Sequence, residues 1–233
     1  MPSSKASPVS PPAKGPIAIR PQYIAQDEQT VLHIKENNFS LAHRDFTVRK
    51  ANGDTLMTIS GKTLSVSLQR EFLDASGLPL FELRKSKSQK KASSSAGWSL
   101  ALPGSEPGQE YDDVLSATFR SFWVHPKLDI KLKNLAPPQH VYRDALHSAV
   151  DPTDSYHENV LLEVRGQDST RLTTHVMCEG RKVIHIRREC DEVTESVYPH
   201  GFGYKPEWEA TVAQGVDVAL AVVIVIILAE HRY

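Results

Sequence analysis

A run of basic side chains is the clearest candidate for binding chemistry in this sequence. Arg84, Lys85, Lys87, Lys90 and Lys91 fall within one short stretch that has no acidic residue, and serines separate several of them. Near an anionic membrane surface each basic group contributes about 1 kcal/mol of attraction, so the stretch predicts reversible binding to phospholipid headgroups. A solvated, flexible linker between two strands is the alternative interpretation.

Histidines are the next group that could bind a ligand, because the chain has 10 of them. His175 and His185 lie on either side of a turn predicted at Glu179-Gly180, so their side chains are expected to approach each other across a hairpin. No carboxylate or cysteine stands at the spacing that a zinc site needs. We therefore expect no metal site and no cofactor.

The two cysteines do not form a disulfide framework. Cys178 adjoins the same turn, and Cys190 lies at the far end of the returning strand, about 26 Å away at roughly 3.3 Å per residue. A bridge within this hairpin is excluded by that separation, and so few cysteines are typical of a reducing compartment. The first residues also lack the apolar segment of a secretory signal. These features predict a cytoplasmic protein.

Catalytic motifs give no support for an enzyme. The adjacent carboxylates Asp112 and Asp113 are typical of a solvated turn, and Gly201 and Gly203 lack the flanking strand and helix of a phosphate-binding loop. No nucleophile elbow occurs in its required context. A net charge of -1 provides no overall field for nucleic acid, so no nucleic-acid partner is expected. A non-enzymatic binding module is the first hypothesis, and an unrecognised enzyme is one alternative.

The elements that must position these residues are predicted to be β-strands. From Val31 onward, twelve segments of strand length alternate apolar and polar residues and are separated by turn residues. Such a pattern is typical of an antiparallel sandwich or barrel. Asn52-Gly53 predicts a type I′ hairpin, because both positions of that turn need positive φ angles. Gly77 and Gly180 mark two further hairpins.

The remaining organisation follows from composition. Residues 1–16 are rich in proline, serine and lysine and have little to bury, which predicts a disordered tail. Residues 17–233 are then expected to form one domain. Irregular loops are expected at about 86–97, 103–113 and 135–159, where the strand pattern breaks.

The C-terminal apolar run, Val218 to Ala229, decides between two architectures. As a helix it would reach roughly 18 Å, well short of a hydrocarbon layer about 30 Å thick. Asp217, just after Gly215, is expected to cap a helix over about 216–230. A membrane tail anchor and a long central strand are the alternatives, although neither explains this start signal.

A helix that is apolar on every side must be surrounded by other elements. Twelve strands closed into a barrel supply a continuous apolar inner wall. The prediction is therefore a mainly β protein: an antiparallel closed barrel of about twelve strands around a hydrophobic C-terminal α-helix. Its expected core residues are Asp217, Val218, Leu220, Val222, Val223, Ile224, Val225, Ile226, Ile227 and Leu228.

Three stretches also carry a family resemblance. The segment "VAQGVDVALAVVIVIILAE" resembles the terminal signature of the LURP-one-related proteins, which share the Tubby C-terminal-like fold with the phospholipid scramblases. The segments "FSLAHRDFTVRKANGDTLMTISGK" and "REFLDASGLPLFELRKS" are similar to the opening hairpins of that family. The resemblance runs from Val31 to Glu230 and implies a twelve-stranded barrel around a C-terminal helix.

The resemblance also implies a membrane-lipid theme. Tubby proteins bind phosphoinositide headgroups on a basic surface, although its residues have no position-by-position match here. The expected function is peripheral binding of anionic phospholipid, or of protein partners, through surface loops. A tail-anchored or scramblase-like membrane protein is the second alternative.

Overall fold

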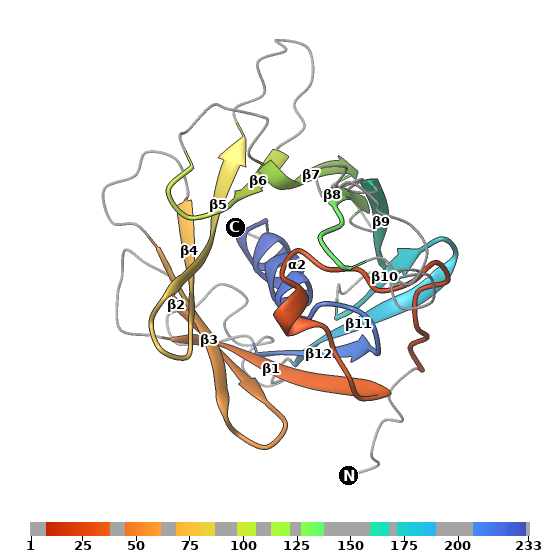
Figure 1. The fold of residues 1–233 in the computed structure, drawn as a ribbon, viewed down its shortest axis with the longest axis horizontal. Helices are drawn as coiled ribbons and strands as arrows, with labels where there is room; N and C mark the ends of the chain where they lie inside the picture. Colours follow the sequence, from red (N-terminus) through yellow and green to blue (C-terminus); the bar gives the residue numbers. More distant parts are fainter. Residues whose placement is uncertain are drawn as a thin grey trace, which may run out of the picture.

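Twelve antiparallel strands close into a barrel, and α-helix α2 runs through its interior (Figure 1). This computed structural model describes residues 8–37, 45–61, 69–86, 97–105, 113–121, 127–137, 159–167, 172–189 and 207–231. The barrel confirms the predicted fold class. It also confirms that the apolar C-terminal run is a helix enclosed by the sheet rather than a central strand.

Each strand pairs with its neighbours in the chain, and the last strand closes the barrel by pairing with the first. The strands are β1 (Gln29–Asn37), β2 (Asp45–Lys50), β3 (Thr55–Gly61), β4 (Gln69–Asp74), β5 (Pro79–Ser86), β6 (Gly97–Ala101), β7 (Asp113–Ser121), β8 (Lys127–Lys133), β9 (Asn159–Gly166), β10 (Thr173–Cys178), β11 (Arg181–Glu189) and β12 (Glu207–Ala213). Because β12 pairs with β1, the closed sheet has no open edge.

Alternation along the strands builds the inner wall. In β8, Leu128, Ile130 and Leu132 are buried, whereas Lys127 and Lys131 between them are exposed. Successive side chains of a strand point to opposite faces of the sheet, so one face of every strand lines the interior. Four phenylalanines are fully buried in that interior: Phe46, Phe72, Phe81 and Phe119.

Helix α2 (Val218–Glu230) occupies the space inside this wall. None of its residues from Val218 to Ala229 is more than 6% exposed, and Asp217 at its N-cap is 0% exposed. The helix is apolar all round, and the barrel surrounds it on all sides. In the described part of the chain, no helix has both the length and the apolar character needed to cross a bilayer.

The hairpin turns are of two kinds. At Glu179-Gly180 both residues have positive φ angles, 50° and 77°, as a type I′ turn requires. At Asn52-Gly53 only the glycine does, with φ 90°, and its N–H donates to the Lys50 carbonyl at 2.9 Å. The predicted type I′ turn at Asn52-Gly53 is therefore wrong. Three residues lie between Lys50 and Asp54, and a loop of that length places glycine last, in the left-handed conformation.

A segment that precedes the first strand closes one mouth of the barrel. We call residues 8–28 the strap; its first part was expected to belong to a disordered tail, of which residues 1–7 lie outside the described residues. The Ser10 N–H donates to the Lys182 carbonyl at 2.9 Å, and Val9 is 8% exposed. The strap passes over the beginning of α2 (Figure 1), and its Ile17 and Ile19 side chains are buried.

Candidate functional site

The two ends of the barrel differ, because α2 begins at one and finishes at the other. The strap end holds Asp217, the strap and the short turns between β2 and β3, β4 and β5, and β10 and β11. The far end holds Glu230, the last residue of α2, together with the end of β5 and the start of β8. From Lys127 to Lys133, β8 spans the barrel, about 20 Å at roughly 3.3 Å per residue.

Asp217 joins the strap to the helix. One carboxylate oxygen accepts from the Ala219 N–H at 2.7 Å, and the other accepts from the N–H groups of Ile19 and Arg20 at 3.0 and 2.8 Å. Its own N–H donates to the Ile17 carbonyl at 2.9 Å. Burial raises the pKa of Asp217 to about 6, although the backbone hydrogen bonds act to lower it.

Two further side chains fasten the strap to the wall. Arg20 donates to the Leu80 carbonyl at 2.8 Å, and its guanidinium lies 5.3 Å from the centre of the Phe81 ring. Asn134, just after β8, accepts from the Ala18 N–H at 2.9 Å and donates to the Pro16 carbonyl at 2.9 Å. These contacts hold the strap across the mouth at both of its sides.

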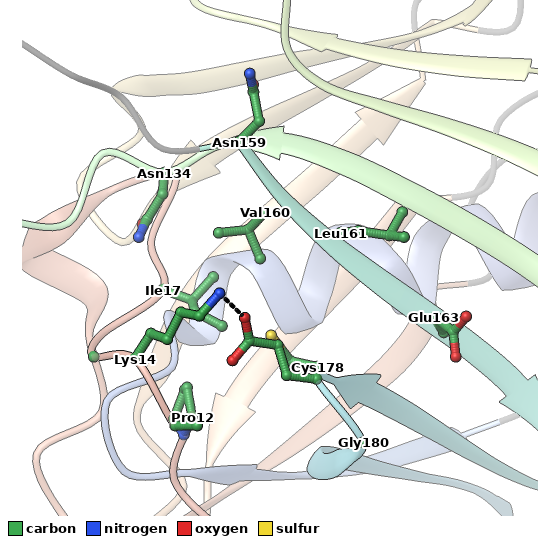
Figure 2. Close-up of a pocket in the computed structure, with 13 residues that line it drawn as sticks. Pro12, Lys14, Ile17, Asn134, Asn159, Val160, Leu161, Glu163, Cys178 and Gly180 are labelled. Carbon is green, nitrogen blue, oxygen red and sulfur yellow. Dashed lines mark ion pairs between the residues drawn. The ribbon is translucent and has the colours of Figure 1, made fainter.

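A pocket of about 470 Å³ remains at the strap end, between the strap, the start of β9 and the β10–β11 turn. We call it the mouth pocket and define it by Lys14, Ile17, Val160, Glu163, Cys178 and Glu179. Lys14 reaches from the strap to Glu179, with its Nζ 2.5 Å from the carboxylate (Figure 2). Ile17 and Val160 line the pocket close to this ion pair (Figure 2).

The basic residues proposed from the sequence are not equivalent. Arg84 donates to the Glu82 carboxylate at 2.6 Å and to the Ser105 carbonyl at 2.8 Å, so its charge is already engaged. Lys85 is exposed at the end of β5, where it pairs in register with Trp98. Lys87, Lys90 and Lys91 lie outside the described residues.

Strand order adds two basic side chains that sequence reasoning missed. Arg120 at the end of β7 and Lys127 at the start of β8 are both exposed at the far end, as Lys85 is. We call these three residues the basic rim. Arg120 pairs with Asp129, whereas Lys85 and Lys127 have no ion pair with any described residue. These residues are far apart in the sequence, and the antiparallel order of β5 to β8 places them at the same end of the barrel.

The histidine pair forms on the outer wall. His175 and His185 are direct partners in the β10–β11 register, and their ring centres are 5.2 Å apart. Burial, and then the positive charges of Lys182 and His185, lower the pKa of His175 to about 4. Burial also lowers the pKa of His185. Within the described ranges, no group of three or more histidine, cysteine or carboxylate side chains is placed to hold a metal ion.

The other sequence candidates do not come together as a site. Cys178 is a buried thiol in the mouth pocket, and Asp113 is the first residue of β7. Asp112, Cys190, Gly201 and Gly203 lie outside the described residues. The features that sequence reasoning missed, the strap and the mouth pocket, both depend on residues 8–17 packing against strands more than a hundred residues away.

Comparison with known proteins agrees with the barrel. Residues 30–229 match the model of the family described as LURP-one-related. A protein from Arabidopsis thaliana with an X-ray structure is similar over 94% of this chain and 100% of its own, with a TM-score of 0.57 and 17% sequence identity. At that identity the similarity shows the fold alone. Among curated proteins, none matches the sequence.

Proposed function

We propose that this chain, which belongs to the LURP-one-related family, is a non-enzymatic module that binds anionic phospholipid at a cytoplasmic membrane surface. Phosphoinositides are the proposed class of lipid. The contact would be peripheral and would use the far end of the barrel. The observation that carries the proposal is the basic rim, in which Lys85 on β5, Arg120 on β7 and Lys127 on β8 are all exposed at that end.

The sequence of the β5–β6 connection supports the same surface. This connection leaves β5 at Ser86, returns at Gly97 and contains Lys87, Lys90 and Lys91. Its two ends are paired with each other in the sheet, so the connection begins and ends beside Lys85. At about 1 kcal/mol for each basic group near an anionic surface, such a set gives weak, reversible binding that salt weakens.

A membrane-inserted protein is the competing interpretation. An anchor would need the apolar terminal run to face lipid, whereas α2 has its apolar side chains inside the barrel. Releasing the helix into lipid would leave the apolar inner wall of the barrel facing solvent. Peripheral attachment requires no such change, and the geometry favours it for that reason.

Vesicle sedimentation tests the proposal. The full chain is mixed with phosphatidylcholine vesicles that contain or lack phosphatidylinositol 4,5-bisphosphate, and the sedimented fraction is measured at low and high salt. Binding is expected only to the anionic vesicles and is expected to weaken as salt is added. Replacing Lys85, Lys87, Lys90 and Lys91 by serine should lower affinity by about fivefold for each charge that contacts lipid.

A charge-matched pair of variants separates a local surface from overall charge. Lys85→Ser with Lys127→Ser removes two charges from the basic rim, and Lys50→Ser with Lys131→Ser removes two exposed charges elsewhere. Only the first pair should reduce sedimentation. Equal losses in the two pairs, or unchanged binding in the fourfold variant, would rule out this surface. Capture of an acidic protein with no vesicle binding would replace lipid by a protein partner.

A further inference from the structure

We propose that the mouth pocket binds a small organic amine, that is, a molecule with a primary ammonium group and an apolar body. This site goes beyond the membrane function proposed above and lies at the opposite end of the barrel. The register places it there, since Asn159 beside the pocket pairs with Lys133, whereas the basic rim includes Lys127 at the other end of the same strand.

The size of the mouth pocket and its apolar floor suit a small ligand. Its volume of about 470 Å³ lies within the range of roughly 300 to 1,000 Å³ that is usual for ligand sites. Ile17 and Cys178 on the floor are 3% and 5% exposed, and Val160 packs against the core. A hydrocarbon or aromatic group placed on this floor would leave water without displacing any buried charge.

The charges that line the pocket favour a cation. Glu163 and Glu179 supply two carboxylates to the lining and Lys14 supplies one ammonium, while Arg165, outside the lining, pairs with Glu163. Among the described residues, no other lining residue carries a charge of either sign. Glu179 can therefore accept an ammonium group in place of Lys14, whereas a carboxylate placed beside Glu163 and Glu179 would be repelled by them.

In the Lys14–Glu179 ion pair across the opening, the ammonium of a ligand can replace that of Lys14. The Lys14 side chain is 67% exposed and that of Glu179 is 38% exposed, so the pair is a surface salt bridge. Such pairs contribute little stability because water solvates both partners well. A ligand ammonium could take the place of Lys14 on Glu179, while its apolar body lies on Ile17 and Val160. Glu163 already pairs with Arg165 at 3.1 Å, so Glu179 is the principal acceptor.

The pocket also couples ligand binding to the strap. Pro12, Lys14 and Ile17 form one wall, and β9 with the β10–β11 turn forms the other. The site is complete only when the strap is docked on the barrel. A ligand that binds this composite pocket would therefore stabilise the docked strap, because it favours the state that contains its site.

Titration of the full chain with a matched series of probes tests the proposal. 2-Phenylethylamine carries an ammonium on an aromatic body, and 3-phenylpropionate carries a carboxylate on a similar one. Calorimetry and amide chemical shifts should detect saturable binding of the amine, with shifts at Gly15 and Gly180, and no binding of the acid. Glu179→Gln should weaken amine binding by about tenfold, because a hydrogen bond from ammonium to a neutral amide is weaker than one to a carboxylate.

A second variant shifts affinity in the other direction. Lys14→Gln removes the competing ammonium and should tighten amine binding a few-fold, which a merely damaged pocket would not do. Glu189→Gln, a carboxylate at the far end, is the matched control and should change nothing. Absence of amine binding, preference for the acid, or equal affinity in Glu179→Gln and the unaltered chain would each overturn the proposal.

Discussion

Arg70 and Glu230 form a buried ion pair that ties the end of the central helix to the barrel wall. The Arg70 Nη2 and Nε atoms donate to the same Glu230 oxygen at 2.6 and 2.9 Å. Their side chains are only 7% and 5% exposed. Next to this pair, His231 stacks on Phe119 with ring centres 3.8 Å apart. Asp217 and the strap fix the beginning of α2, and this ion pair fixes its end.

Glu230→Gln should destabilise the protein by about 3 to 5 kcal/mol, because it leaves the guanidinium of Arg70 buried without a compensating charge. The free energy of unfolding, measured by urea denaturation, gives the effect directly. Replacing both residues by apolar side chains, as in Arg70→Met with Glu230→Leu, should cost less than Glu230→Gln alone, since no uncompensated charge is left in the interior.

Lys35 and Glu207 provide the control for that prediction. They form an ion pair between β1 and β12, but their side chains are 58% and 41% exposed. Glu207→Gln should therefore change the free energy of unfolding by less than about 1 kcal/mol. If Glu207→Gln and Glu230→Gln cost the same, burial does not govern the energetics of the Arg70–Glu230 pair.

The central architecture could be predicted because its signals are local and cumulative. Twelve alternating segments and one run that is apolar all round leave few arrangements that bury everything. Gly180 correctly indicated the hairpin between β10 and β11. Asn52-Gly53 did not specify the turn type, because the type also depends on how many residues lie unpaired between the two strands. The residue types alone do not give the number of unpaired residues.

The strap, the mouth pocket and the place of Arg120 and Lys127 in the basic rim could not be predicted for a different reason. The proline, serine and lysine of residues 1–16 indicate disorder when that segment is considered alone. The burial of the strap depends on a barrel mouth built from distant strands. Arg70 and Glu230 are likewise 160 residues apart in sequence. Contacts of this kind follow from the closure of the sheet and leave no pattern in a short window of sequence.

Asp217 should make the protein more stable as the pH falls through 6. Its pKa in the folded state is raised from 3.8 to about 6, so protonation is favoured by folding. The stabilisation that protonated Asp217 contributes is fully present below pH 3.8 and is lost as the pH rises through 6. Between pH 7.5 and pH 5 the protein should gain about 1 kcal/mol from this group.

Asp217→Asn isolates that contribution. The variant does not titrate at this position, although it also weakens the contacts to Ile19 and Arg20, because an amide nitrogen cannot accept from their N–H groups. The quantity to follow is the difference in unfolding free energy between the two proteins across the pH range. That difference should grow as the pH falls from 7.5 to 5, and a constant difference would contradict the raised pKa.

The histidine pair should act in the opposite direction. Folding lowers the pKa of His175 from 6.5 to about 4 and lowers that of His185 as well, so their neutral forms are favoured in the folded state. This contribution is present above pH 6.5 and is lost as the pH falls towards 4. Protonation would place two positive rings opposite each other on β10 and β11, next to Lys182.

Substitution of both histidines by glutamine tests this assignment. Relative to the variant, the unaltered protein should lose stability between pH 6.5 and pH 4.5, as measured by melting temperature in matched buffers. His33→Gln, on the outer face of β1, serves as the control. Its melting temperature should depend on pH in the same way as that of the unaltered protein. Parallel profiles for the unaltered and doubly substituted proteins would exclude the pair as a source of acid sensitivity.

The central helix should be required for folding, and shortening the chain to end at Gln214 tests that requirement. The shortened chain would lose the only element that fills the interior of the described barrel, and the inward side chains of all twelve strands would face a void or water. It should show no cooperative melting and should lose the near-ultraviolet signal of the buried Trp98 and Trp208. Ile224→Ala gives a graded companion, with an expected loss of about 2 to 5 kcal/mol and a fold that survives. A shortened chain that stays monomeric, compact and cooperative would mean that the sheet is stable without its core.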